Sequence, residues 1–330
     1  MNSSTRSELN DEHAALTSNV GVADVSDRTL LEIEGADRVG FLHNLCTADI
    51  KRLATGTGCE AFVTNVQGKI LGHGFAWCFP DSLQWDTVSG QTETLIEHFD
   101  RFIISEDVQL TDRTGECGQL LISGVGAVAT LEELGIAPIP DAPLTHHEVE
   151  FDGEVCSLRK STLIGSTCFQ LVCPSAQKER LREILLQAGA KACSPAAVEM
   201  ARVEAGSPLY ALDITDQNLP QEVNRDARAI SFDKGCYLGQ ETVARVDALG
   251  HVNRKLIGLQ FAASSPPSAG TELTIDGKKV GQVTTLVHSP RLGAPLALAY
   301  LRREFNDQSI LVFDSPVGEA SVVDLPVAAE

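Results

Sequence analysis

The sequence is poor in several features that define large classes of protein. Only 5% of its 330 residues are aromatic, and its formal net charge is −19. It therefore lacks both the stacking side chains and the basic surface with which proteins bind nucleic acids. No apolar run approaches the roughly 20 residues that span a membrane, and the polar first 18 residues lack the apolar core of a signal peptide. These absences predict a cytoplasmic protein that binds neither nucleic acid nor a membrane directly.

The cysteines lack the spacing of two common arrangements. There are nine of them, an odd number, and they are scattered from Cys46 to Cys236 without a C-x-x-C pair. This pattern favours reduced thiols over a disulfide framework, and it offers no zinc-ligand spacing. We therefore predict no metal site in this chain.

The remaining composition predicts a folded, multidomain chain. Hydrophobic residues make up 43%, which is enough for packed cores in two or three domains. Residues 1–18 are expected to be a loose tail. Over 19–250, strand-like alternation mixes with helical spacing, the pattern of an α+β fold with one subdomain centred on about 118–192. Over 251–330, short strands separated by turns such as Asp276-Gly277 predict a small β-barrel.

The sharpest local motif is Lys234-Gly-Cys-Tyr-Leu-Gly-Gln-Glu241, within a stretch where bases outnumber acids. Two glycines bracket Cys236 and helical character begins at Leu238, so we place Cys236 at or just before a helix N-terminus, beside Lys234. A helix N-terminus and a nearby lysine each favour the thiolate form of a cysteine, so the motif predicts a reactive or metal-binding thiol. The alternative is a buried structural cysteine in a glycine turn, since no histidine lies close in the sequence to activate it.

Two further segments carry weaker signals. Arg202-Val-Glu-Ala-Gly206 places a carboxylate, Glu204, near the end of an apolar helix. Such a carboxylate is usually a surface charge, but it can also accept two adjacent N–H groups from a flat heterocycle such as a pterin. The segment from Phe62 to Leu71 by itself predicts only a hairpin.

Together these three segments resemble the folate-binding superfamily of the glycine-cleavage T-protein, an aminomethyltransferase. The octapeptide at 234–241 resembles the signature of its YgfZ-type branch, whose members are linked to iron–sulfur cluster assembly and repair. The resemblance extends from about Leu30 to Leu325. It implies a three-domain α+β fold, in which two interleaved α+β units and a C-terminal β-barrel surround a central folate site.

The resemblance also implies roles for individual residues. Glu204 matches the glutamate that holds the pterin ring of tetrahydrofolate. Cys236 matches the functionally critical cysteine of the branch, with Lys234 beside it. On charge grounds, Arg228 and Arg245 are our candidates for binding the glutamate carboxylates of the folate. The residues expected to bind the cofactor are Glu204, Arg228, Arg245, Tyr237 and Gln240.

One departure from the family pattern concerns the hairpin after Asn65. Aminomethyltransferases carry a pair of aspartates there, one of them catalytic, where this chain has Gly72 and His73, and no carboxylate lies between Glu60 and Asp81. His73 could replace the base, although a strand histidine is more often structural or exposed. The chain therefore resembles the folate-binding part of the family and lacks the acid of the transferase.

These features leave three functions open. The first, which we expect, is a tetrahydrofolate-binding accessory protein that supports iron–sulfur enzymes such as those that modify tRNA. A partner or assembly protein is then needed, because a cluster normally takes about four ligands. The second is a folate-dependent aminomethyltransferase or demethylase, against which the missing aspartate counts. The third is a thiol enzyme with Cys236 as nucleophile, which needs a base within hydrogen-bond reach.

Overall fold

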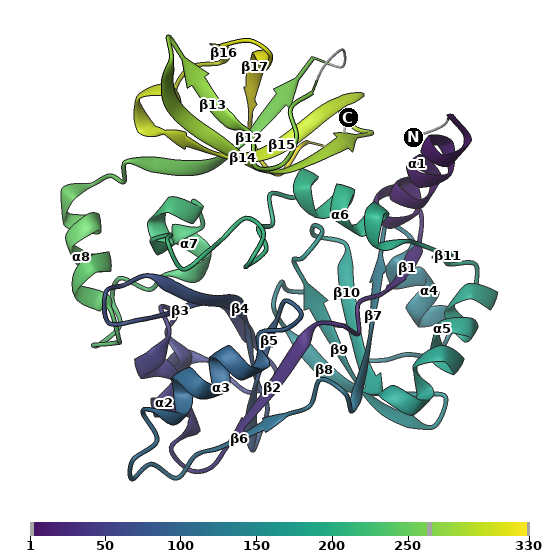
Figure 1. Ribbon diagram of the computed structural model, residues 1–330. Coiled ribbons are helices and arrows are strands. Elements are labelled where there is room, and N and C mark those ends of the chain that lie inside the picture. The colour runs from purple at the N-terminus through teal and green to yellow at the C-terminus, as the bar shows by residue number, and fades with distance from the viewer. Residues whose placement is uncertain (1–2, 263–265, 329–330) are drawn as a thin grey trace.

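The computed structural model describes residues 3–262 and 266–328. Three β-sheets with flanking helices form three lobes (Figure 1). The chain begins in a lobe with a six-stranded sheet, then forms the whole five-stranded lobe, and returns to complete the first lobe. The C-terminal residues form the third lobe, the barrel. The predicted α+β fold, with two interleaved units and a C-terminal barrel, is thereby confirmed.

The five-stranded lobe holds an antiparallel sheet in the order β3-β4-β5-β2-β6. Its elements are β2 (Thr29–Glu34), α2 (Arg38–Leu45), β3 (Gly58–Thr64), β4 (Ile70–Cys78), β5 (Ser82–Thr87), α3 (Thr92–Asp100) and β6 (Gln109–Asp112). On α3, Leu95 and Phe99 lie one turn apart and are fully buried. Asn65 turns the chain between β3 and β4, because its side-chain oxygen accepts hydrogen bonds from the backbone N–H groups of Gln67 and Lys69.

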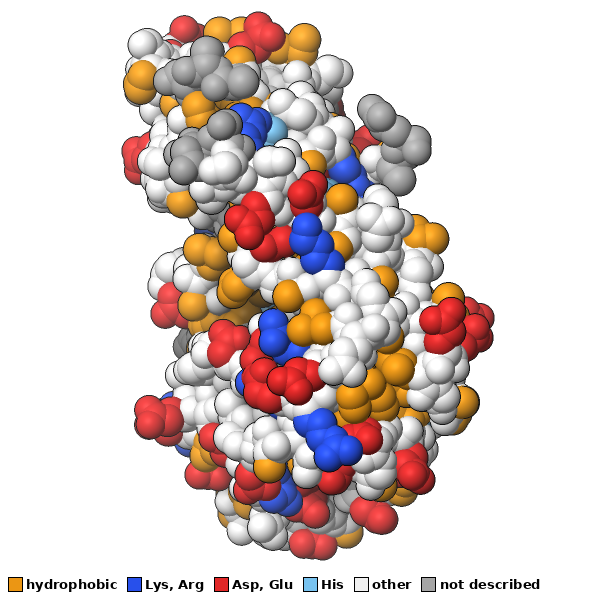
Figure 2. All heavy atoms as spheres, turned by 90° about the vertical axis from the view of Figure 1, so that its right-hand side faces the viewer, with side chains coloured by type: hydrophobic (Ala, Val, Ile, Leu, Met, Phe, Trp, Pro, Cys, Tyr) orange, Lys and Arg blue, Asp and Glu red, His pale blue; other side chains and the backbone are white. Residues whose placement is uncertain are grey.

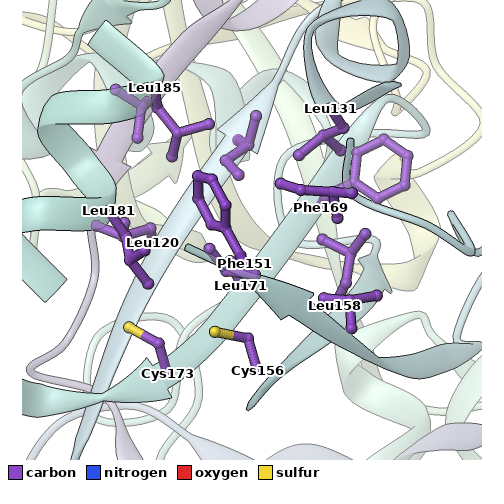
Figure 3. Packing of buried hydrophobic residues seen from close by; sticks show 14 of the residues in the cluster. Leu120, Leu131, Phe151, Cys156, Leu158, Phe169, Leu171, Cys173, Leu181 and Leu185 are labelled. Carbon is purple, nitrogen blue, oxygen red and sulfur yellow. The ribbon is translucent and has the colours of Figure 1, made fainter. Parts of the chain in front are cut away.

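The six-stranded lobe is built from two parts of the chain, and its strands run in the order β11-β1-β7-β10-β9-β8. The strands are β1 (Gly21–Asp24), β7 (Cys117–Ser123), β8 (His146–Phe151), β9 (Glu154–Ser161), β10 (Cys168–Pro174) and β11 (Lys191–Ala192). Its helices include α4 (Ala127–Glu133) and α5 (Lys178–Gln187). Figure 3 shows Leu181 and Leu185 of α5 packed over the sheet, with Cys156 and Cys173 in the same core.

The N-terminal residues form a helix, α1 (Ser3–Ser18), so the expectation of a loose tail was wrong. Leu9 and Leu16 lie on the side of α1 that packs against Ala197 and Ala201 of helix α6. The mostly polar composition hid this narrow apolar stripe. Burial against a helix that starts about 180 residues later holds the segment in place.

The barrel lobe is an antiparallel sheet in the order β13-β14-β15-β12-β17-β16. Its strands are β12 (Arg254–Phe261), β13 (Glu272–Ile275), β14 (Lys278–Ser289), β15 (Ala294–Arg302), β16 (Ile310–Phe313) and β17 (Gly318–Val323). The predicted Asp276-Gly277 hairpin forms, and both turn residues have positive φ.

The segment that joins the lobes contains α6 (Pro195–Glu204), α7 (Asp226–Ala229) and α8 (Gln240–Leu249). Arg202 of α6 donates to Asp213 at 2.8 Å. Asp213 in turn accepts hydrogen bonds of 2.6 Å from the hydroxyl groups of Thr284 and Thr285 on β14. This chain of contacts fixes α6 beneath the barrel, as Figure 1 shows.

The described part of the chain contains no helix long and apolar enough to cross a membrane. All nine cysteines lie within that part, and all are free thiols. The face seen in Figure 2 intersperses acidic and basic side chains with hydrophobic patches, so the negative net charge does not produce one uninterrupted acidic surface there.

Candidate functional site

Glu204 ends α6 and is buried where the lobes meet. The helix begins at Ser194, whose side chain accepts from the N–H of Ala197, and Pro195 occupies its first turn. Glu204 is 2% exposed. Its Oε2 lies 2.7 Å from Nε2 of His13, and its Oε1 accepts from Ser289 Oγ at 2.5 Å and from the backbone N–H of Arg291 at 3.3 Å. Burial alone would raise the pKa of Glu204, but the hydrogen bonds from His13 and Ser289 lower it, so the carboxylate is ionised.

A cavity of about 730 Å³ opens beside Glu204. Residues from all three lobes and the connecting segment line it, including Glu60 of β3, Arg228 of α7, and Arg291 after β14. Arg228 is exposed and forms no ion pair with any described residue. The volume suits a small-molecule ligand, and the ionised carboxylate with two arginines suits a polar, partly anionic one. The cavity is therefore the candidate binding site.

A buried ionic network adjoins this cavity through Glu60. It includes His73, which stands where an aspartate of the family was expected. The guanidinium of Arg225 donates to both oxygens of Glu60, with Nη2 to Oε2 at 2.6 Å, and Nε2 of His73 lies 2.7 Å from Oε1. Glu60 is 1% exposed. Burial opposes its ionisation, but the charge of Arg225 and the hydrogen bonds from His73 and Arg225 hold the pKa of Glu60 well below its ordinary value. Although β4 itself carries no acid, the neighbouring strand supplies a carboxylate to His73.

Lys234 and Cys236 do not form the pair that their spacing suggested. The Lys234 ammonium is buried and donates to three backbone carbonyls at the end of α2, those of His43 at 2.5 Å and of Cys46 and Ala48 at 2.7 Å. It also lies 4.8 Å from the centre of the Tyr237 ring. Burial lowers the pKa of Lys234. Lys234 therefore stabilises the loop that follows α2, whereas Cys236, two residues further along the chain, is exposed.

The helix that was expected to begin at Leu238, with Cys236 at or just before its N-terminus, begins at Gln240. Cys236 therefore lies four residues before it, outside the first turn, where the helix dipole acts. Cys236 is nevertheless the most accessible of the cysteines, because the other eight are buried or half-buried. The alternative interpretation from the sequence, that Cys236 is a buried structural cysteine, is therefore wrong.

Of the predicted folate-binding residues, the structure brings two together. Glu204 and Arg228 line the same cavity. Tyr237 is buried beneath Lys234, Gln240 is half-buried at the start of α8, and Arg245 lies on the exposed face of that helix. None of these last three is among the residues that line the Glu204 cavity.

Several residues around the site were missed. His13 lay in the supposed tail, although its spacing from Leu9 and Leu16 is helical and could have indicated a buried face. In the sequence, Arg225 is only one of the bases in the stretch around the 234–241 motif. No local pattern indicates that it pairs with Glu60. Among the described residues, no group of three or more His, Cys, Asp or Glu side chains could hold a metal ion.

Comparisons with known proteins match this architecture. Residues 2–234 match the GCVT N-terminal domain, and residues 254–327 match the glycine cleavage T-protein C-terminal barrel domain. A chloroplastic protein of Arabidopsis thaliana named as a putative transferase is 27% identical over 89% of this chain and 68% of its own length. An aminomethyltransferase of Herpetosiphon aurantiacus is 28% identical over 96% of this chain and 88% of its own length.

Among solved structures, glycine cleavage system aminomethyltransferase T from Bartonella henselae has a similar fold. It superposes with a TM-score of 0.88 over 97% of this chain and 89% of its own, at 21% identity. That identity supports the shared fold alone. Both family domains are present in order and together cover almost the whole chain. The chain therefore belongs to the glycine cleavage T-protein family.

Proposed function

We propose that this protein is a YgfZ-type member of the family, which binds tetrahydrofolate and supports the assembly or repair of iron–sulfur clusters in the cytoplasm. The observation that carries the proposal is the ionised, buried Glu204 in a cavity of ligand size that Arg228 also lines. A pterin offers an N–H and an exocyclic amine side by side, and an ionised carboxylate can accept from both.

Binding must rearrange the contacts that Glu204 makes in the free protein. A carboxylate has about four acceptor positions, and His13, Ser289 and Arg291 already occupy them. The pterin edge would replace the contact from His13, which comes from a different helix, while Ser289 keeps the carboxylate oriented. Arg228 would bind a carboxylate of the folate tail, because its charge is free among the described residues.

The site supports binding more than aminomethyl transfer. Gly72 and His73 stand where the family's aspartates were expected, and the nearby Glu60 is held ionised by Arg225. Folate-dependent aminomethyl transfer or demethylation is the second candidate, since relatives of this chain are named aminomethyltransferases. Net one-carbon transfer to tetrahydrofolate by the purified protein would select the second function over the first.

The iron–sulfur part of the proposal depends on Cys236. Its thiol is exposed and accessible to a partner protein. One cysteine supplies only one of the roughly four ligands that a cluster takes, so the client or assembly protein must supply the others. A thiol enzyme is less well supported, because Lys234 is engaged elsewhere and cannot activate the thiol.

The test is an anaerobic calorimetric titration of the purified protein with tetrahydrofolate. Glu204→Gln replaces half of the acceptor pair with a donor and should weaken binding by about a hundredfold. Glu183→Gln, at an exposed position on α5, is the matched control and should bind normally. Equal affinities of the Glu204 variant and the wild type would place folate elsewhere, and no binding by the wild type would reject the proposed ligand.

A further inference from the structure

Helix α1 is joined to the Glu204 site by two adjacent residues. His13 is 3% exposed, and its Nε2 lies 2.7 Å from Oε2 of Glu204. The carboxylate of Glu12 accepts hydrogen bonds from the backbone N–H of Ser194, at 2.8 Å, and from the Ser194 hydroxyl. Ser194 precedes the first turn of α6, and Glu204 ends that helix. Helix α1 is therefore attached to both ends of α6, beside which it lies at the edge of the molecule (Figure 1).

In the free protein, the acceptor positions of Glu204 are already taken. The two oxygens of an ionised carboxylate together accept about four hydrogen bonds. His13, Ser289 and the backbone N–H of Arg291 donate to them, and Nε of Arg291 lies 3.4 Å from Oε2. A ligand that pairs with both oxygens must therefore displace one of these partners.

His13 is the partner with the fewest other ties. The hydroxyl of Ser289 also accepts from the N–H of Leu292 at 3.1 Å, and Arg291 also donates to the carbonyl of Val327 at 3.0 Å. The ring of His13, by contrast, forms no second hydrogen bond with the described residues. A ligand therefore displaces His13 more readily than Ser289 or Arg291.

The C-terminal end of α1 is fixed to the six-stranded lobe. The carbonyl of Leu16 accepts from the Ser123 hydroxyl at 2.8 Å, and the carbonyl of Asn19, just after the helix, accepts from the N–H of Gly126 at 2.8 Å. Leu16 and Thr17 also line the Glu204 cavity. This end of the helix is thus a lasting part of the cavity wall.

The N-terminal part of α1 is held more loosely. Its residues 4–8 are exposed, and the contact of Arg6 with His288 on β14 lies at the surface. Leu9 is only half-buried in the cluster between α1 and α6. The first turns of α1 can therefore move away from α6 once the two anchors near the middle of the helix are broken, while its C-terminal end stays attached.

We propose that residues 3–13 of α1 form a latch on the Glu204 site. The N–H of His13 holds one oxygen of Glu204 in the free protein, and a ligand that donates to this oxygen releases the latch. This inference rests on the proposed ligand site at Glu204 and adds its regulation. Because coupling between two equilibria is reciprocal, loosening the latch must tighten ligand binding, and the ligand must loosen the latch by the same factor.

Calorimetric titration with tetrahydrofolate tests the first half of this relation. Glu12→Ala removes the anchor at Ser194 and alters no group that contacts Glu204, so it should tighten binding about tenfold. Glu8→Ala, at an exposed position one turn earlier on α1, is the matched control and should bind like the wild type. Unchanged or weaker binding by Glu12→Ala would overturn the inference.

Hydrogen exchange measured by mass spectrometry tests the second half. Saturating tetrahydrofolate should speed the exchange of the backbone amides of residues 7–13 in the wild type, whereas the amides of α5 should not change. Glu12→Ala should show the faster exchange of residues 7–13 without any ligand. Unchanged or slower exchange of these amides with the ligand bound would overturn the latch.

The two measurements separate the latch from the proposed ligand. Binding that is lost in Glu204→Gln but leaves the exchange of residues 7–13 unchanged would reject the latch alone. No binding by the wild type would reject the proposed ligand, and the ligand-free variants would then decide the latch. Faster exchange in Glu12→Ala than in Glu8→Ala would support it, and equal exchange in both would reject it as well.

Discussion

Two groups of charged and reactive residues differ in how their separation along the chain relates to their contact in the fold. Glu60 and Arg225, 165 positions apart, are joined by paired hydrogen bonds, with His73 on the same carboxylate. Lys234 and Cys236 are two positions apart, yet the lysine is 6% exposed and faces inward whereas the cysteine is exposed. The short separation of Lys234 and Cys236 thus suggested a contact that does not form. The long separation of Glu60 and Arg225 gave no indication of the contact that does.

The difference follows from how each side chain meets its hydrogen-bonding needs. The Glu60 network pairs a buried negative charge with a buried positive one, and each is costly without the other. The Lys234 ammonium uses its three donors on backbone carbonyls in the last turn of α2 and in the loop that follows it. Cys236 has no comparable requirement, so nothing draws it into the interior.

The largest effect should come from breaking the first group. Glu60→Gln removes the negative charge and leaves Arg225 buried without a counter-charge, which should lower the free energy of unfolding by about 3–5 kcal/mol. Urea denaturation near neutral pH measures it. Glu150→Gln, at an exposed position on β8, is the control and should stay within about 0.5 kcal/mol of the wild type. Equal stability of both variants would mean that the network contributes nothing.

The same carboxylate sets the pH dependence of stability. Its pKa in the folded protein lies below the 4.5 that a glutamate ordinarily has. The unfolded chain therefore binds a proton first as the pH falls, and the stabilisation, complete above 4.5, is lost toward a pH of about 2. The stability gap between wild type and Glu60→Gln should close over this range, and a gap that stays constant would contradict the assignment.

A smaller loss should follow from changing the lysine of the second group. Lys234→Met keeps the apolar stem but removes the donor shared by three carbonyl oxygens. Among the described residues, only the carbonyl of Ala48 has another backbone donor, the N–H of Ile50. We expect a loss of about 2–4 kcal/mol in the free energy of unfolding. Lys51→Met, at an exposed position nearby, should be almost neutral. Thermal and urea unfolding measure both. An unchanged free energy of unfolding in the Lys234 variant would mean that these three hydrogen bonds contribute nothing to stability.

The sequence predicted the parts of the fold that depend on local patterns. Alternation in the last 80 residues and the Asp276-Gly277 turn indicated the barrel. The family assignment rested on motifs whose residues occur together along the chain, and it is confirmed. The YgfZ-type branch stays a proposal, because neither domain match distinguishes it.

The missed parts depend on contacts between distant segments. Helix α1 is held by α6, and its narrow stripe of Leu9 and Leu16 is too weak a signal within a polar segment. Glu60 reaches His73 only because β3 and β4 pair with Phe62 opposite His73. A register of this kind cannot be read from either strand alone. The orientation of Lys234 likewise depends on where α2 ends in space.

The smallest change in stability should come from the cysteine, where the functional effect should be largest. Cys236→Ser alters one exposed atom and should shift the free energy of unfolding by less than about 0.5 kcal/mol, with tetrahydrofolate binding unchanged. It should nevertheless fail to restore iron–sulfur enzyme activity in a strain that lacks this protein, whereas Cys193→Ser should restore it. Full complementation by Cys236→Ser would remove the thiol from the mechanism. Failure of both variants would indicate a general loss of folded protein, and the measured stabilities tell these cases apart.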